Sequence, residues 1–383
     1  MKHSVALLSA GIAAAAAQNQ TSYLSRFADS FIRRGVELDY GYTQATLYLG
    51  FEKAYDLTKN ETFYDWYQSQ VEGILYPNGS IIDWNYSFHS LDEYRMGNNY
   101  LYWFNQTGDE KYKKAAQIVR TQLNGHPRTP TGGFWHREPT YPNQMWLDGI
   151  FMADTFYAKW TSQFDADNTT AWDDIVLQYD NIEEHTRNTT SGLLVHGYDE
   201  SKVAVWANRV TGAAPLVWDR AVGWYFISLW ETLQVFPQSH EGYARLLEYY
   251  TTLAAALKTA QDESGGFWLI MSEQYVGAKG NYIESSATAM FVLGWLRGIK
   301  SGYLDSADYL DAAKKGYNLL IDDFVVENGD GTLNWEGTVS VGSLNSNGTF
   351  EYYISVPLAS NDFKGAGPFM LAAYEWESWA SSA

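Results

Sequence analysis

The feature that most constrains the fold is a succession of helix-length segments with apolar residues at helical spacing, which fills most of the chain. Short turns separate these segments, for example at 106–109 and 300–302. The pattern predicts about twelve helices, at 22–34, 43–57, 61–75, 91–105, 109–123, 146–163, 169–187, 218–236, 240–261, 284–300, 304–323 and 366–381.

The helices are paired in sequence, which predicts an all-α fold: either an open α/α solenoid or its closed form, an α/α barrel. No linker rich in Pro and Ser divides the chain, so we expect one catalytic domain over residues 18–383. Residues 192–210, 265–280 and 332–357 change to short strand-like runs with Gly and Asn, and we expect short β-hairpin insertions there.

The first residues are typical of a secretory signal peptide. Lys2 and His3 precede an apolar run, and Ala15 and Ala17 form a small-residue cleavage pattern, so we expect residues 1–17 to be removed. Later apolar runs are too short to span a bilayer. Eight Asn-x-Ser/Thr sequences favour a secreted, extracellular glycoprotein of a eukaryote. They begin at Asn19, Asn60, Asn78, Asn85, Asn105, Asn168, Asn188 and Asn347.

Charge and composition exclude several functions. The net charge of -19 opposes binding to nucleic acid or to an anionic membrane. It does not oppose a small anionic ligand, because a local cluster of Arg and His acts within a screening length of about 8 Å. The chain has no Cys, so a thiolate nucleophile is excluded. No H-E-x-x-H pattern or phosphate-binding glycine loop occurs, and we expect neither metal nor cofactor.

Unusual residues gather at the starts of the even-numbered helices, which would all begin at one end of an α/α barrel. Helix capping is an alternative explanation for Asp92 and Asp148, because Asp is favoured at helix N-termini. Capping does not explain aromatic and basic residues at the same positions. The residues that would surround this mouth are Tyr42, Asp92, Trp146, Asp148, Trp218, Arg220, Trp224 and Glu284.

The segment 126–160 combines His, Arg and Trp residues with Asp148, which are the parts of a site for an acidic carbohydrate. In the W-x-R-x-x-G-W run, Arg220 and Trp224 lie on adjacent turns of one helix face. Arg220 could hold a carboxylate and Trp224 could stack on a sugar. The alternative is a core aromatic pair whose Arg reaches out to solvent. His196 lies in a predicted hairpin, where a lone His is usually structural.

Four segments, HPRTPTGGFWH, YPNQMWLDGIFMA, the W-x-R-x-x-G-W run and NYIESSATAM, resemble glycoside hydrolase family 105, the unsaturated rhamnogalacturonyl hydrolases. The resemblance extends from about Tyr42 to the C-terminus. It implies an (α/α)6 barrel with Asp148 as general acid and base and Asp92 as a second carboxylate. It also implies that the sugar site is lined by Tyr42, His136, Arg137, Trp146, His196, Trp218, Arg220 and Trp224.

The resemblance further implies the reaction. Protonated Asp148 would donate to C4 of a 4,5-unsaturated uronic acid and then activate the water that attacks C5. The acid step requires a raised pKa, which we expect from burial beside Trp146 and repulsion from Asp92. The expected substrate is the unsaturated galacturonyl-rhamnose that a lyase releases from rhamnogalacturonan I. Where Arg137 stands the family often has Lys, and where Asp219 and Val222 stand it has small or amide residues.

Three alternatives remain open. The enzyme could act on an unsaturated glucuronyl residue of another polysaccharide. It could be an ordinary glycosidase that uses Asp92 and Asp148 as its two carboxylates. It could also be a carbohydrate-binding protein without catalysis. In each case we expect a monomer whose partner is an oligosaccharide.

Overall fold

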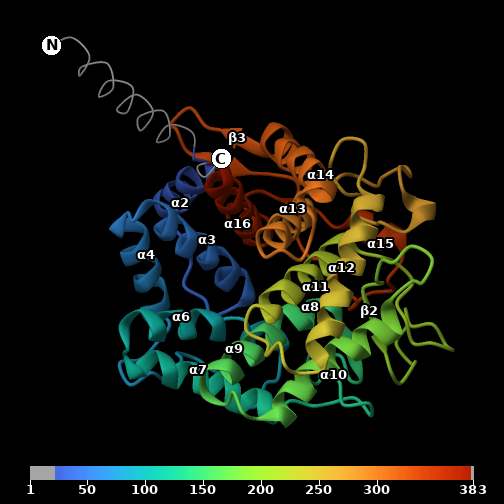
Figure 1. Ribbon diagram of the computed structural model, residues 1–383, viewed down its shortest axis with the longest axis horizontal. Helices are drawn as coiled ribbons and strands as arrows, with labels where there is room; N and C mark the ends of the chain where they lie inside the picture. The colour runs from blue at the N-terminus through green and yellow to red at the C-terminus, as the bar shows by residue number, and fades with distance from the viewer. Residues whose placement is uncertain (1–21, 381–383) are drawn as a thin grey trace.

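The computed structural model describes residues 22–380 and shows two concentric rings of helices (Figure 1). In each consecutive pair, one helix lies outside and the next inside. The outer helices are α2 (Tyr23–Arg34), α4 (Glu61–Glu72), α7 (Glu110–Asn124), α10 (Thr169–Thr186), α12 (Gly242–Ala260) and α14 (Ser306–Leu319). The inner helices are α3 (Tyr42–Thr58), α6 (Gly97–Thr107), α9 (Thr155–Phe164), α11 (Asp219–Leu233), α13 (Ser285–Lys300) and α16 (Phe363–Ala380).

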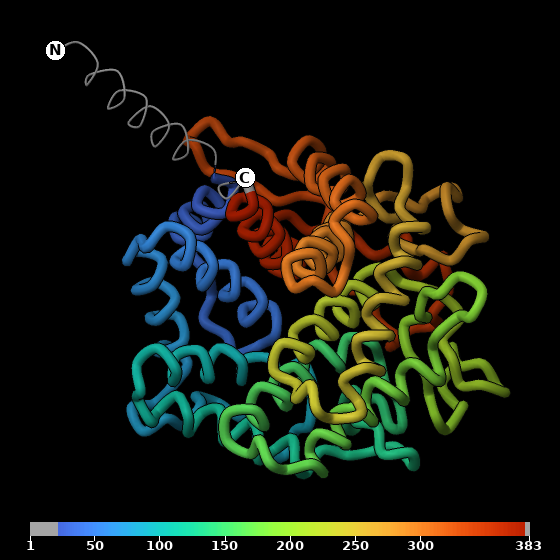
Figure 2. The backbone as a smooth tube through the Cα atoms, viewed as in Figure 1, coloured from blue at the N-terminus to red at the C-terminus, as the bar shows by residue number. Residues whose placement is uncertain are grey.

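The inner ring closes because α16 packs on α3, as well as on α13. Figure 2 shows the first and last described helices side by side, and the Leu24 amide donates to Glu377 of α16 at 3.3 Å. The closed (α/α)6 barrel predicted from sequence is therefore confirmed, and the open solenoid is excluded. The signal peptide expected at residues 1–17 lies outside the described residues. None of the described helices is both long and apolar enough to cross a membrane.

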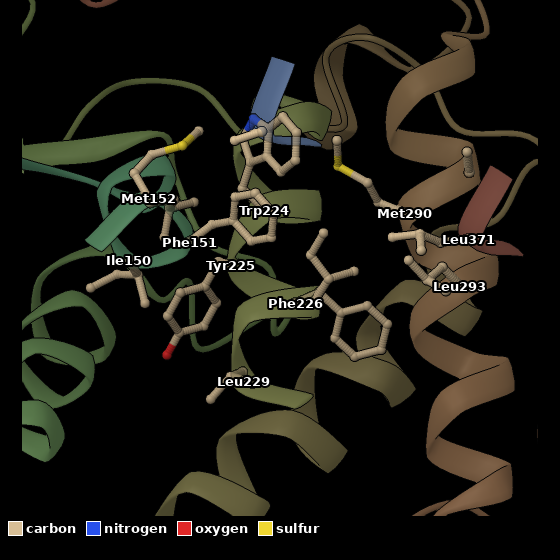
Figure 3. Packing of buried hydrophobic residues seen from close by; sticks show 14 of the residues in the cluster. Ile150, Phe151, Met152, Trp224, Tyr225, Phe226, Leu229, Met290, Leu293 and Leu371 are labelled. Carbon is tan, nitrogen blue, oxygen red and sulfur yellow. The ribbon is translucent and has the colours of Figure 1, made fainter. Parts of the chain in front are cut away.

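The sequence explains which helices lie inside. In α13 every residue from Ser285 to Gly298 is buried, since this helix is apolar or small on all sides. By contrast, α7 buries a single stripe that includes Tyr112 and Val119. Glycines allow the inner helices to approach closely: a Cβ on Gly294 of α13 would lie 2.2 Å from the Phe226 ring of α11. Figure 3 shows Phe226 and its neighbours in this core.

Side chains cap helices in both rings, as when Asn60 accepts from Thr62 N in α4 and Glu284 accepts from Ala287 N in α13. Asp92 lies instead in the first turn of α5 (Leu91–Tyr94), after an N-cap residue that makes no side-chain cap bond. Asp148 has the same position in α8 (Leu147–Gly149). Capping therefore does not account for either carboxylate.

Two predicted inner helices are interrupted. The helix expected at 91–105 is divided into α5 and α6, and the one at 146–163 contains a π-helical turn, η1 (Ile150–Asp154), between α8 and α9. Such turns occur often at functional sites. Both interruptions lie at the starts of inner helices, next to Asp92 and Asp148.

The first two predicted hairpins are present as antiparallel bridges rather than as regular strand pairs: Tyr198 bridges Ala213, and Trp268 bridges Ile283. Residues 192–210 contain β2 (Gly197–Asp199), but it pairs with the distant β1 (Gln144–Trp146). Residues 265–280 contain isolated bridges and a 3-10 turn, η2 (Glu273–Tyr275). A hairpin is present near the third segment, between β3 (Val325–Glu327) and β4 (Leu333–Trp335). After it, β5 (Thr338–Val339) pairs with β6 (Leu358–Ala359), and α15 (Phe350–Ser355) lies between them.

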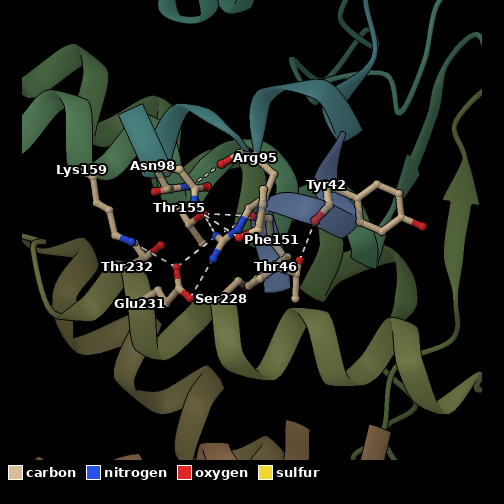
Figure 4. A network of polar contacts seen from close by, with 12 residues as sticks. Tyr42, Thr46, Arg95, Asn98, Phe151, Thr155, Lys159, Ser228, Glu231 and Thr232 are labelled. Atoms are coloured by element: carbon tan, nitrogen blue, oxygen red, sulfur yellow. Dashed lines mark hydrogen bonds and ion pairs between the residues drawn. The ribbon is translucent and has the colours of Figure 1, made fainter. Parts of the chain in front are cut away.

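A buried ion pair joins Arg95, between α5 and α6, to Glu231 of α11 (Figure 4). Arg95, which is 0% exposed, donates to both carboxylate oxygens of Glu231 at 3.0 Å. Lys159 adds a contact of 3.3 Å to Glu231. Below this pair, the C-terminal halves of the inner helices surround a cavity of about 750 Å³. The Tyr42 ring points away from the pair.

Candidate active site

Extended segments joined by backbone hydrogen bonds form a collar at the N-terminal ends of the inner helices. Ser90 pairs with Arg137, and the His136 amide donates to Gln144 O at 2.7 Å. The ladder continues through β1 and β2, and the His196 amide donates to Leu216 O at 3.1 Å. Because these bonds join segments that are far apart in sequence, the collar brings the predicted site residues to one end of the barrel.

At the centre of the collar, Asp148 lies beside His196. The distance from Asp148 Oδ2 to His196 Nε2 is 3.2 Å, and the other ring nitrogen, Nδ1, lies 2.6 Å from the Tyr353 hydroxyl. His196 is 0% exposed, whereas the Asp148 side chain is 13% exposed. A ligand can therefore reach the carboxylate, whereas the imidazole is covered by the protein.

Asp92 is held by a different cation. Its Oδ2 accepts from Arg137 Nη2 at 2.5 Å, and Arg137 Nε donates to Ser90 Oγ at 3.1 Å. His136 Nε2 lies 3.7 Å from the other carboxylate oxygen of Asp92. At 31% exposed, Arg137 is the most accessible of these charged side chains. Asp92 thus serves as the partner of a guanidinium group that faces the mouth.

The expected raised pKa of Asp148 was wrong for the free protein. Burial raises the pKa of Asp148. The charge of His196 and its contact with the carboxylate lower the pKa, and so does the charge of His136. The net result is a lowered pKa. Repulsion from Asp92, which we had expected, is not among the main causes. Burial lowers the pKa of His136, against the opposing effects of both carboxylates.

Arg220 is only 1% exposed, and its partners are groups of the protein. Its Nη1 lies 3.7 Å from Glu284 and its Nη2 donates to Ser340 O at 3.2 Å. Glu284 also caps α13, because it accepts from Ala287 N at 2.9 Å. Next to it, burial and the charge of Glu284 hold the pKa of Asp219 well above its usual range. This side of the collar contains a buried charge network in which Arg220 is already paired.

The predicted aromatic residues have different surroundings. The Trp146 ring stacks on His136 at 4.1 Å between centroids, and the Trp218 ring lies 4.6 Å from His196. Both rings therefore orient the imidazoles beside the carboxylates. Trp224 is 1% exposed and stacks on Phe151 at 4.5 Å in the core (Figure 3). Its position supports the core interpretation over the predicted stacking on a sugar.

Tyr42 connects the core to the site. Its ring meets Trp224 edge to face at 6.4 Å. Burial raises the pKa of Tyr42, and the charge of Asp92 adds to this effect while that of Arg220 opposes it. Tyr42 therefore remains neutral, close enough to the carboxylates to interact with their charges.

Sequence reasoning missed Tyr353. This residue is 157 positions from His196, and α15 lies inside a segment for which a hairpin was predicted. Nothing in its local sequence indicates a contact with His196. Two members of the 126–160 segment lie elsewhere: His126 bonds to Tyr94 at 3.0 Å, and Arg128 pairs with Asp174 at 2.6 Å.

Over the part of the chain that the structure describes, no cluster of three His, Asp or Glu side chains has a metal-binding arrangement.

The arrangement sets one partly exposed carboxylate beside a buried imidazole and a second carboxylate beside an accessible Arg. It can exchange protons at Asp148 and attract an anionic ligand at Arg137.

Comparison with known proteins agrees with this description. Residues 17–380 match Glycosyl Hydrolase Family 88. A family 105 glycoside hydrolase of C. acetobutylicum is 35% identical, with a TM-score of 0.88 over 94% of this chain and 100% of that one. Protein Atu3128 of Agrobacterium fabrum is 35% identical over 193 residues, which are 48% of this chain and 82% of that protein.

A more distant protein shares the same fold. The unsaturated glucuronyl hydrolase of Bacillus sp. GL1 is 14% identical, with a TM-score of 0.66 over 92% of this chain and 94% of that one. At this identity the likeness shows the fold alone. The extended match and the 35% identical structure establish that this chain belongs to Glycosyl Hydrolase Family 88, together with the family 105 glycoside hydrolases.

Proposed function

We propose that this glycoside hydrolase removes a 4,5-unsaturated uronic acid from the non-reducing end of oligosaccharides that a lyase has produced. The proposed substrate is unsaturated galacturonyl-rhamnose from rhamnogalacturonan I. Support comes from the 35% identical family 105 hydrolase and from the shared fold of the unsaturated glucuronyl hydrolase.

One observation carries the proposal: the two carboxylates have unlike partners. Asp92 is bound to Arg137 at 2.5 Å, whereas Asp148 contacts His196, a residue that can carry a proton. An ordinary glycosidase needs two carboxyl groups free to act on opposite sides of the bond. A double bond conjugated to a carboxylate needs only one group, which first donates and then accepts a proton. The geometry favours the second reaction.

In this mechanism, protonated Asp148 transfers its proton to C4 of the unsaturated ring. Positive charge develops at C5 and on the ring oxygen. Ionised Asp148 then removes a proton from the water that attacks C5, and a hemiketal forms. The hemiketal opens and releases the neighbouring sugar, so that one molecule of water is consumed and Asp148 ends in its starting state.

The lowered pKa of free Asp148 is compatible with this role because the substrate itself changes the local charge. The substrate carboxylate adds a negative charge and its rings exclude water, and both effects raise the pKa of a neighbouring carboxyl group. Arg137 has the accessible guanidinium that would attract the substrate carboxylate.

The test compares unsaturated rhamnogalacturonan disaccharide with its saturated counterpart by following the ultraviolet absorbance of the double bond. Loss of absorbance from the unsaturated disaccharide, together with stability of the saturated one, is the expected result. Cleavage of the saturated disaccharide would instead identify an ordinary glycosidase. If neither reacts, unsaturated glucuronyl oligosaccharides would be assayed next, and binding without turnover of any of them would indicate a carbohydrate-binding protein.

We also propose that the enzyme acts outside the cell as a monomer. The support for secretion is the N-terminal sequence, in which an apolar run precedes Ala15 and Ala17. N-terminal sequencing of protein from the culture medium should begin at residue 18, and light scattering should give a mass near 43.4 kDa or somewhat below, plus any glycans. An intact Met1 on the mature protein would refute the cleavage.

A further inference from the structure

We propose that Tyr353 is a positioning residue that orients the His196 imidazole so that His196 and Asp148 share the catalytic proton. The kinetic consequences of this inference rest on the proposed function. The tautomer and protonation of the His196 ring can be measured without any substrate.

The geometry is a chain of three groups. The Tyr353 hydroxyl lies 2.6 Å from His196 Nδ1, and His196 Nε2 lies 3.2 Å from Asp148 Oδ2. Neither atom of the second contact forms a hydrogen bond to a described residue, so this contact is a close ion-pair approach and not an aligned hydrogen bond. Asp148 is the described carboxylate in contact with Nε2.

Burial makes this chain rigid. Tyr353 is 1% exposed and His196 is 0% exposed. The Trp218 ring lies 4.6 Å from the imidazole and the Trp146 ring meets it at 5.5 Å. In addition, His196 O accepts from Leu147 N at 3.0 Å, which ties the His196 backbone to the start of the Asp148 helix. The imidazole is thus held by two indole rings and through its backbone.

The hydroxyl has a chemical consequence. When the pair carries the catalytic proton, Nδ1–H can donate to the Tyr353 oxygen, and the proton lies either on Nε2 or on Asp148. The C–H bond at C4 forms as the O–H bond of Asp148 breaks. In the second step Asp148 takes a proton from the attacking water, so the pair regains the proton that it lost. Burial holds the pKa of Tyr353 well above its usual range, and Tyr353 therefore remains neutral throughout.

Other groups around the pair are less suited to this role. His136 acts on Asp148 by its charge, but its nearest carboxylate contact is with Asp92. Tyr42 interacts with the charges of both carboxylates and has its ring against Trp224. Among these groups, Tyr353 is the one within hydrogen-bond distance of the His196 ring.

The substitution Tyr353→Phe removes the hydroxyl that accepts from His196 Nδ1–H and keeps the aromatic ring. In Tyr353→Phe a buried Nδ1–H has no partner, which disfavours the protonated imidazole. We expect kcat to fall about tenfold or more, with KM little changed. The alkaline limb of the pH–rate profile should shift to lower pH, since the pair then loses its proton more easily.

Tyr352→Phe is the matched control. This neighbouring residue also lies in α15, and its hydroxyl accepts from Ser343 N at 3.0 Å. The control loses one hydrogen bond from the same helix without touching His196, so its kcat and pH profile should stay close to those of wild type. Equal effects of the two substitutions would show that α15 is merely structural and would overturn the proposal.

Nitrogen NMR of protein labelled at its histidines separates this inference from the proposed function. The His196 signals, assigned by their loss in a His196→Asn variant, should change their tautomer or titration in Tyr353→Phe and not in Tyr352→Phe. Unchanged His196 signals in Tyr353→Phe would refute the positioning role, whatever the substrate. If these signals change but wild type leaves the unsaturated disaccharide intact, the proposed substrate fails and the positioning role stands.

Discussion

Glu231→Gln should strongly destabilise the barrel, because it leaves the buried Arg95 guanidinium without its counter-charge. Arg95 is 0% exposed and makes two bonds of 3.0 Å to the carboxylate. Each hydrogen bond to a charged group contributes about 1.5–3 kcal/mol. Loss of one partner of a buried pair costs about 3–5 kcal/mol in total.

The remaining partners of Arg95 place the expected value toward the lower end of this range. Arg95 Nη1 still donates to Thr155 Oγ1 at 2.6 Å and to Phe151 O at 3.2 Å, and the guanidinium lies 3.6 Å from the Phe151 ring centroid. The amide of the variant also keeps one acceptor oxygen. We therefore expect a loss of about 3 kcal/mol in the free energy of unfolding.

Urea unfolding followed by far-ultraviolet circular dichroism measures this loss, with Arg95→Met/Glu231→Leu as the comparison. Since the double variant removes both charges of the pair, it should lose less stability than Glu231→Gln. A loss below about 1 kcal/mol for Glu231→Gln would refute the reasoning. So would a double variant at least as unstable as the single one.

Three further predictions concern the site, the core and pH. Asp148→Asn should keep the far-ultraviolet spectrum and lower kcat by about 10²–10⁴, and activity within about tenfold of wild type would exclude the acid and base role. Gly294→Ala should lower the free energy of unfolding by about 1–3 kcal/mol, because its Cβ would lie 2.2 Å from Phe226, whereas Gly329→Ala meets nothing within 4 Å and should be neutral. Burial and the charge of Asp92 raise the pKa of Glu93 to about 7. Because the pKa of Glu93 is higher in the folded than in the unfolded protein, its contribution to the free energy of unfolding is fully present below the unfolded-state pKa. This contribution is lost as the pH rises through the folded-state pKa of about 7. Urea unfolding at pH 5 and pH 8 should therefore differ less in Glu93→Gln than in wild type, and an equal difference would contradict the assignment.

Local sequence predicted the elements of this fold well because they depend on local spacing. The apolar positions of α13 recur on every face, so its place in the inner ring can be read from its composition. Alternation of inner and outer helices also placed Asp92 and Asp148 at one end. Strand pairing could not be predicted in the same way, since β2 takes its partner from β1, 53 residues away at the Met145–Tyr198 pair.

The sequence by itself determined the helical barrel, the end at which the site lies and the carboxylates within it, because helix periodicity and chain order are local properties. Only the tertiary structure decided what those carboxylates contact. Asp92 meets Arg137 and Asp148 meets His196, and the contact with His196, together with the charge of His136, reversed the expected direction of the Asp148 pKa shift. Tyr353 joins them through a fold that brings residues 157 positions apart to hydrogen-bond distance. Charge and hydrogen bonding act through space, and the distances that control them exist only once the rings have closed.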